Sequence, residues 1–166
     1  MYIVSDRETE VPCILANMSI SLKIPYEKKD SKSAEVILKV PAKADVSGIC
    51  GIVESNMVVS WAAESKDESR SDKKDNELTF TFLKDSSDFY LYSVRMKIQL
   101  DETHFPDAAN ATFEDASTEE LKLFSAPVNT GLYKCDPETV VDAKKAVMTV
   151  TDVVLIAFNT DKTLSP

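Results

Sequence analysis

The stretch that decides the fold is Cys13-Ile-Leu-Ala-Asn-Met-Ser-Ile-Ser-Leu-Lys-Ile24, in which apolar and polar residues alternate with a period of two. Apolar side chains occupy the even positions from Ile14 to Ile24, whereas the odd positions from Asn17 onward are polar. Successive side chains of a β-strand point to opposite faces of the sheet, so this period is typical of a strand. The stretch therefore predicts a long strand with one face buried and the other in solvent.

The same alternation recurs along most of the chain. It predicts strands over 34–40, 78–82 and 90–100, with Tyr90 and Tyr92 on the apolar face of the last one. Pro41 ends the first of these because proline lacks a ladder donor, and residues 84–88 read as a hairpin connection between the other two. Shorter runs predict further strands at 52–62, 111–114, 121–124, 132–135 and 147–158. Only 137–145 has helix-like composition, enough for a turn or two.

Many strands separated by polar turns predict an all-β protein with two packed, mostly antiparallel sheets rather than an α/β fold. A chain of 166 residues fits one domain. We expect residues 1–12 to be a flexible segment and residues 13–166 to form the single domain. Residues 64–77 mix acidic, basic and polar side chains without one apolar residue, which predicts a surface loop.

The formal net charge of -9 argues against binding to nucleic acid or to anionic lipid, because such binding needs lysine and arginine. The acidity is local, since residues 101–120 hold seven acids and no lysine or arginine. No apolar stretch approaches the roughly 18 residues that cross a bilayer. Two interpretations stay open: a naturally soluble protein, or a protein whose membrane segments lie outside this sequence.

Catalytic chemistry has few candidates in this chain. His104 is the one histidine, and no nucleophile elbow, zinc-binding helix motif or phosphate loop accompanies it. Asp101, Glu102 and Asp107 offer oxygen ligands for Ca²⁺, but their spacing matches no EF-hand, so a solvated acidic face is favoured. We therefore expect no enzyme, cofactor or metal; an enzyme built on a cluster of acids with perturbed pKa values is the remote alternative.

Aromatic side chains have two interpretations. Trp61 and the pairs Phe80/Phe82 and Tyr90/Tyr92 can line a groove for a ligand or partner, but their strand spacing favours packing.

Three cysteines and two N-glycosylation sequons indicate in which cellular compartment the protein could reside. An odd cysteine count leaves two alternatives: free thiols in an intracellular protein, or an extracytoplasmic protein in which Cys13 and Cys50 join two strands while Cys135 lacks its partner. The sequons are Asn17-Met-Ser19, on the polar face of its strand, and Asn110-Ala-Thr112, in the acidic segment. Both asparagines are expected to be accessible to glycosylation.

Several short segments, taken in order, resemble the luminal domain of the lysosome-associated membrane protein (LAMP) family. They are Cys13-Ile-Leu-Ala-Asn-Met-Ser-Ile-Ser-Leu-Lys-Ile-Pro-Tyr26, Gly48-Ile-Cys50, Leu78-Thr-Phe-Thr-Phe82, Phe89-Tyr-Leu-Tyr-Ser-Val94, Tyr133-Lys-Cys135 and Ile156-Ala-Phe158. The spacing of Cys13 and Cys50 is typical of the family's first disulfide loop. The resemblance therefore implies a Cys13–Cys50 disulfide, and it implies that Cys135 pairs with a cysteine absent from this chain.

The resemblance also implies a β-prism of two packed sheets, glycosylated at Asn17 and Asn110, that faces the lumen of lysosomes, endosomes or synaptic-type vesicles, with some copies at the cell surface. Such a domain belongs to a single-pass glycoprotein whose transmembrane helix lies outside this chain. It is not an enzyme; it coats the membrane, self-associates, or helps sort a partner membrane protein. The alternative from another class is a soluble all-β carrier of a small ligand or lipid, which would enclose a large apolar cavity.

Overall fold

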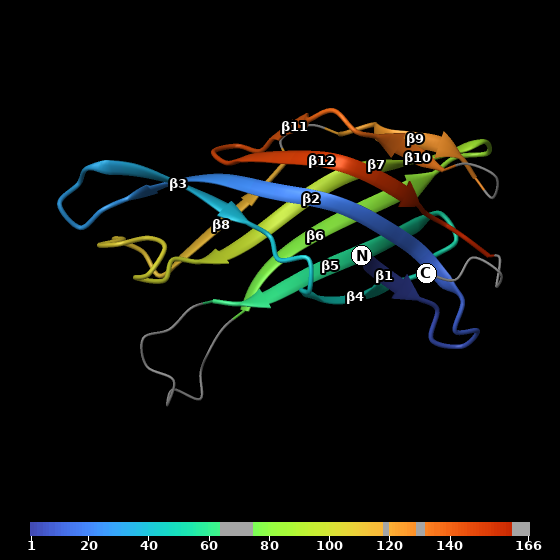
Figure 1. Cartoon of the computed structure of the whole chain (residues 1–166), viewed down its shortest axis with the longest axis horizontal. Helices are drawn as coiled ribbons and strands as arrows, with labels where there is room; N and C mark the ends of the chain where they lie inside the picture. The colour runs from blue at the N-terminus through green and yellow to red at the C-terminus, as the bar shows by residue number, and fades with distance from the viewer. Residues whose placement is uncertain (64–74, 118–119, 129–131, 161–166) are drawn as a thin grey trace.

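The computed structural model describes residues 1–63, 75–117, 120–128 and 132–160. Every regular element among these residues is a β-strand, and the strands form two antiparallel sheets (Figure 1). The predicted all-β class with two packed sheets is confirmed. No helix in the described ranges is long and apolar enough to span a membrane.

Sheet 1 is built on two long central strands, β2 (Pro12–Glu27) and β12 (Val147–Ile156), which pair antiparallel. Four short strands line the outer edges of this pair: β1 (Tyr2–Ser5), β3 (Ser33–Lys39), β10 (Tyr133–Cys135) and β11 (Thr139–Asp142). β1 and β3 pair with the two halves of β2, and β10 and β11 pair with β12. The alternating stretch at residues 13–24 thus lies in one of the two central strands of sheet 1.

Sheet 2 is a meander whose strand order follows the chain from β4 to β7. Its members are β4 (Asp45–Ile49), β5 (Glu54–Ala62), β6 (Asp75–Lys84), β7 (Asp88–Gln99), β8 (Thr112–Ala116) and β9 (Leu123–Pro127). β8 and β9 both pair with β7, and the turn between β6 and β7 is the hairpin predicted at residues 84–88.

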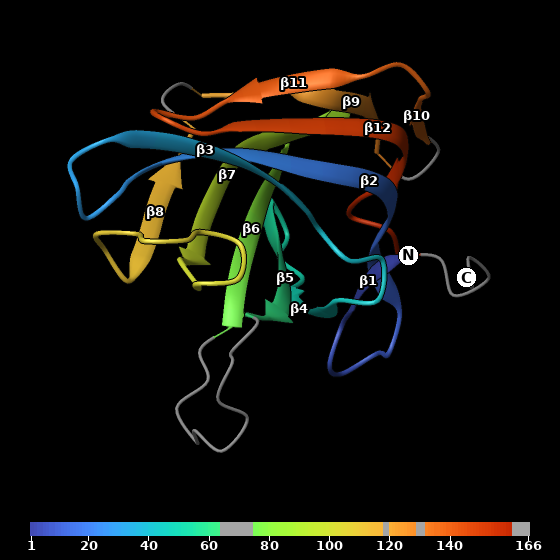
Figure 2. The same ribbon diagram turned by 60° about the vertical axis from the view of Figure 1, so that its left-hand side comes forward.

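The two sheets lie face to face with their strands running across one another (Figure 2). Each sheet turns its apolar alternate residues inward, and the core includes Ile14 and Leu22 of β2 and Phe80 and Phe82 of β6, all 0% exposed. The rings of Phe80 and Phe82 stack with centroids 6.5 Å apart. The packing interpretation of this pair is therefore confirmed, and Trp61 is a half-buried residue packed against the same core.

Two β-bulges change which face the side chains take. In β7 the register with β6 shifts by one residue at Tyr92, so Phe89 and Leu91 are buried while Tyr90 and Tyr92 are only half-buried. The expectation that both tyrosines point inward is wrong for this reason. A bulge adds one unpaired residue and reverses the alternation beyond it.

The second bulge lies in β12, at Asp152. This residue adopts a φ of 54°, a left-handed conformation that aspartate tolerates better than most side chains. The buried positions consequently change from Met148 and Val150 to Val153 and Leu155. A strict alternation read along 147–158 cannot place both halves of this strand correctly.

Three further expectations need correction. Residues 1–12 are not a flexible segment throughout, because Tyr2–Ser5 pairs with β2 and buries Tyr2 and Val4. Residues 137–145 hold no helical turn and contain β11 instead. Of the loop expected at 64–77, residues 64–74 lie outside the described residues, and 75–77 already belong to β6.

Candidate interaction surface

A disulfide joins the two sheets near one end of the sandwich. Cys13 lies in β2 of sheet 1, and Cys50 directly follows β4 of sheet 2, with Cα atoms 6.1 Å apart. The last described residues contribute to the same end, because the Asn159 side-chain amide donates to the carbonyl of Pro12 at 2.8 Å. The two cysteines that the sequence singled out are therefore a covalent bridge between the layers.

Cys50 belongs to a turn at residues 49–53, here called the β4–β5 tip, which comprises the last residue of β4 and the connection to β5. Its three large apolar side chains point into solvent: Ile49 is 65% exposed, Ile52 85% and Val53 60%. The backbone of the tip is held by hydrogen bonds from Ile49 N to Asn56 Oδ1 and from Gly51 N to Ser55 Oγ, and Val53 O accepts from Lys84 N at 3.0 Å. The exposed side chains are thus carried by a backbone that these hydrogen bonds hold in place.

Gly48 lets the two strands below the tip approach closely. A Cβ atom at this position would lie 2.2 Å from the backbone oxygen of Asn56, so any side chain would push β4 away from β5. Beside the tip lies a hollow of about 430 Å³ whose lining includes Ile52, Lys84, Phe158 and Thr160. The end of the described chain is therefore next to the tip.

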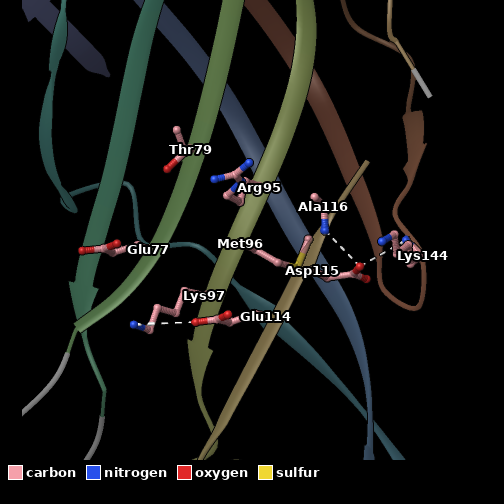
Figure 3. Close-up of a pocket in the computed structure, with 9 residues that line it drawn as sticks. All are labelled: Glu77, Thr79, Arg95, Met96, Lys97, Glu114, Asp115, Ala116 and Lys144. Carbon is pink, nitrogen blue, oxygen red and sulfur yellow. Dashed lines mark hydrogen bonds and ion pairs between the residues drawn. The ribbon is translucent and has the colours of Figure 1, made fainter. Parts of the chain in front are cut away.

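A second hollow, of about 420 Å³, lies on the outer face of sheet 2 (Figure 3). Its charges alternate in sign across the strands: Lys97 stands opposite Glu77 of β6 and forms an ion pair with Glu114 of β8, with Nζ and Oε1 3.7 Å apart. In the neighbouring row, Arg95 lies between Thr79 and Ala116. Such a surface offers both donors and acceptors to a polar partner.

Asp115, at the edge of this hollow, is a buried carboxylate that ties the two sheets together. It lies in β8 and accepts backbone N–H bonds from Ala116 and from the turn at residues 144–146, between β11 and β12. Burial raises the pKa of this carboxyl, but the four N–H donors outweigh it and hold the pKa below its ordinary value. Asp115 is thus an ionised structural anchor rather than a free acid.

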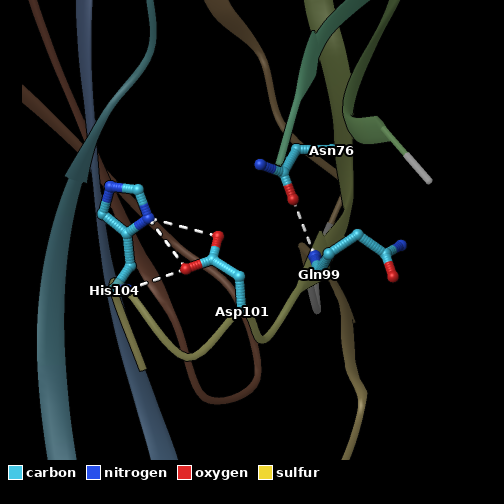
Figure 4. Close-up of polar contacts among 4 residues, drawn as sticks. All are labelled: Asn76, Gln99, Asp101 and His104. Carbon is cyan, nitrogen blue, oxygen red and sulfur yellow. Dashed lines mark hydrogen bonds and ion pairs between the residues drawn. The ribbon is translucent and has the colours of Figure 1, made fainter. Parts of the chain in front are cut away.

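The acidic segment also contacts sheet 1, through the loop between β7 and β8 in which Asp101 and His104 are hydrogen-bonded (Figure 4). His104 Nδ1 lies 2.9 Å from Asp101 Oδ1, which also accepts the His104 backbone N–H. The next residue, Phe105, packs edge-on against Tyr26 of β2 with ring centroids 5.3 Å apart. The lone histidine is therefore engaged in shaping a loop that contacts sheet 1.

Two of the three acids considered for calcium, Asp101 and Glu102, have other side-chain partners in the structure. Asp101 bonds His104, and the Glu102 carboxylate accepts the backbone N–H of Asp107. Within the ranges that the structure describes, no group of three or more histidine, cysteine, aspartate or glutamate side chains could hold a metal ion. Glu119, which contributes to the charge of the acidic segment, lies outside those ranges.

The sequons and the third cysteine lie apart from one another. Asn17 is exposed on the outer face of β2, opposite Val154 of β12, and Asn110 is exposed in the connection between β7 and β8. Cys135 is half-buried in β10 as a free thiol 3.6 Å from the carbonyl oxygen of Pro137. The fold thus brings Cys13 and Cys50 together. Cys135, Asn17 and Asn110 lie elsewhere on the domain.

Two features of this surface are not predicted from the sequence. The strand predicted at 52–62 includes Ile52 and Val53, but β5 begins at Glu54; the two adjacent apolar residues after Gly51 break the alternation and mark an irregular segment. The sequence gives no signal for Asp115, because three of its four donors lie about 30 residues away and the fourth is the backbone N–H of the next residue, Ala116.

Comparison with known proteins gives consistent matches. Residues 1–165 match the family model for lysosome-associated membrane glycoprotein 2-like luminal domains. Lysosome-associated membrane glycoprotein 1 from Mus musculus is 33% identical over 150 residues, which cover 90% of this chain and 33% of the relative. The Gallus gallus counterpart is 31% identical over 155 residues, with the same coverage of 90% and 33%. The chain spans about a third of the length of the curated relatives it matches.

Solved structures give the same fold. The membrane-proximal domain of mouse lysosome-associated membrane protein 1 superposes with a TM-score of 0.75 at 29% identity, covering 96% of this chain and 88% of that one. The membrane-distal domain of mouse lysosome-associated membrane protein 2 also gives a TM-score of 0.75, at 19% identity, covering 99% of this chain and 95% of that one.

Proposed function

Because the chain belongs to the lysosome-associated membrane glycoprotein family as a luminal domain, and so faces the lysosomal lumen, we propose that it is the membrane-proximal domain of a single-pass glycoprotein and acts by protein binding rather than by catalysis. The 29% identity to the membrane-proximal domain of mouse lysosome-associated membrane protein 1 supports the position. The transmembrane helix of this proposal lies outside the chain.

A binding role fits the state of the groups that acid–base chemistry would use. The His104 imidazole is bonded to Asp101, and the Asp115 carboxylate is saturated by four backbone donors. The carrier alternative would need an enclosed apolar cavity, whereas the inward positions of both sheets in the described residues are filled by core side chains such as Phe80 and Leu22. Surface contacts therefore explain this architecture better than an internal ligand.

Within that role, self-association through the outer face of sheet 2 is the form we favour. The row of Glu77, Lys97 and Glu114 is self-complementary, because a second copy can set its acids against the lysine of the first. A glycan on Asn17 would cover the outer face of sheet 1 and leave this face open. Sorting of a partner membrane protein is a further role that the same face can serve.

Charge reversal tests this surface. In cells that express two differently tagged copies of the anchored protein, Lys97→Glu is expected to reduce capture of the second copy severalfold, because it places three acids in one row. Lys39→Glu on the exposed side of β3 is the matched control and is expected to leave capture unchanged. Equal capture for wild type and both variants would refute self-association through this face.

The sequons give a separate prediction. Asn17→Gln and Asn110→Gln are each expected to remove one glycan from the protein made in the secretory pathway, because both asparagines are exposed. Intact-protein mass spectrometry before and after enzymatic deglycosylation measures the change. A wild-type mass that deglycosylation does not alter would show that neither sequon is used.

A further inference from the structure

The β4–β5 tip is the most concentrated group of exposed apolar side chains that the structure describes. Three of the seven large apolar residues that are strongly exposed, Ile49, Ile52 and Val53, fall within five consecutive positions. Single exposed apolar residues need no explanation, but a cluster on a fixed support suggests a contact surface. The disulfide at Cys50 and the hydrogen bonds of the tip keep these side chains from collapsing onto the core.

The position of the tip indicates which surface it meets. Thr160, the last described residue, lines the same hollow as Ile52, so the described chain ends beside the tip. If a membrane anchor follows, as the proposed function requires, the end of the sandwich that carries the tip is the end closest to the bilayer. The apolar side chains then face the lipid surface.

The size and the charge of the tip fit lipid better than another protein. Stable protein interfaces bury about 800 Å² on each partner and involve some 20 residues a side, far more than three side chains supply. A few apolar side chains at the boundary of headgroups and acyl chains contribute useful binding when the domain is already held at the membrane. The acids nearby, Asp6, Glu8 and Glu54, outnumber the bases Arg7 and Lys84, so this end of the domain offers no net positive charge to attract anionic lipid.

We propose that the β4–β5 tip inserts Ile52 and Val53, with Ile49 beside them, into the luminal leaflet of the membrane that anchors the protein. The contact is apolar and therefore needs no anionic lipid. It orients the sandwich on the membrane and turns the outer face of sheet 2 sideways, toward neighbouring copies. This inference rests on the proposed membrane-proximal position.

A fluorescence experiment tests the insertion. The chain, with a C-terminal hexahistidine tag and Trp61→Phe to remove the native tryptophan, is tethered to phosphatidylcholine vesicles that contain a nickel-chelating lipid. Ile52→Trp places the probe on the tip, and Ile37→Trp, at a position 67% exposed on β3, is the matched control. Lipids with brominated acyl chains quench a tryptophan only where it reaches the acyl region.

The expected result is at least a twofold loss of Ile52→Trp fluorescence with brominated lipid, with a blue-shifted emission, and no change for Ile37→Trp. Equal quenching of the two probes, or none, would overturn the proposal, as would quenching that appears only when phosphatidylserine is added. If Ile52→Trp does not fold, Val53→Trp replaces it with the same outcomes. Because the vesicle supplies the tether, the result of this experiment does not depend on whether the natural protein carries a membrane anchor. Topology mapping of the natural protein tests the anchor separately.

Discussion

Replacing Cys50 by serine is expected to lower the free energy of unfolding by about 4 kcal/mol, the loop-entropy value for a cross-link that joins residues 37 apart. The effect is large because single domains of this kind are stable by only about 5–15 kcal/mol. The bridge also joins the two sheets directly, so its loss frees β4 and the β4–β5 tip from β2. Urea denaturation followed by circular dichroism measures the change.

Cys135→Ser is the matched control, because this half-buried thiol makes no disulfide in the structure. It is expected to change the free energy of unfolding by less than about 1 kcal/mol. If Cys50→Ser and Cys135→Ser unfold at the same urea concentration as the wild-type protein, the disulfide does not stabilise the sandwich and the account of this end is wrong.

Asp115→Ala is expected to destabilise the domain by about 3 kcal/mol, because it leaves backbone donors of β8 and of the β11–β12 turn without their acceptor. Glu114→Ala removes the adjacent carboxylate, whose side chain is 67% exposed and whose ion pair with Lys97 is at the surface. The control is therefore expected to cost no more than about 0.5 kcal/mol. Similar losses for the two variants would contradict the anchoring role of Asp115.

The lowered pKa of Asp115 determines how the difference in free energy of unfolding between wild type and Asp115→Ala depends on pH. A carboxyl whose folded-state pKa lies below its unfolded value, about 3.9, contributes fully above that value and loses its contribution as the pH falls through the folded-state pKa. The stability gap between wild type and Asp115→Ala should thus be the same at pH 7 and pH 5, and should narrow only below about pH 4. A gap that already narrows between pH 7 and pH 5 would indicate a raised pKa instead.

The long strands could be predicted from the sequence because their burial is periodic. Burial alternates from Ile14 to the end of β2 and along β6 as far as Phe82, and the hairpin between β6 and β7 follows from its polar residues. β1, β4 and β11 are short edge strands with four or five residues each, too few for a period to stand out. Their formation depends on pairing with the next strand along the chain, β2, β5 and β12 respectively, rather than on a pattern of their own.

The bulges at Tyr92 and Asp152 mark another limit. Each reverses the alternation within a single strand, so a pattern read from one half misplaces the other half. The features of the candidate interaction surface also differ in how far the sequence predicts them. The cysteine pair could be anticipated from family order, whereas the tip and Asp115 acquire their roles only from contacts that the folded sheets create.

The central claim is that this chain is a luminal domain in which Cys13 and Cys50 join two β-sheets. Peptide mapping by mass spectrometry of the natural protein from a lysosomal fraction, alkylated before and after reduction, tests it most directly. The account predicts a Cys13–Cys50 linked peptide that appears only without reduction. Alkylated free thiols at both positions in the unreduced sample would contradict it.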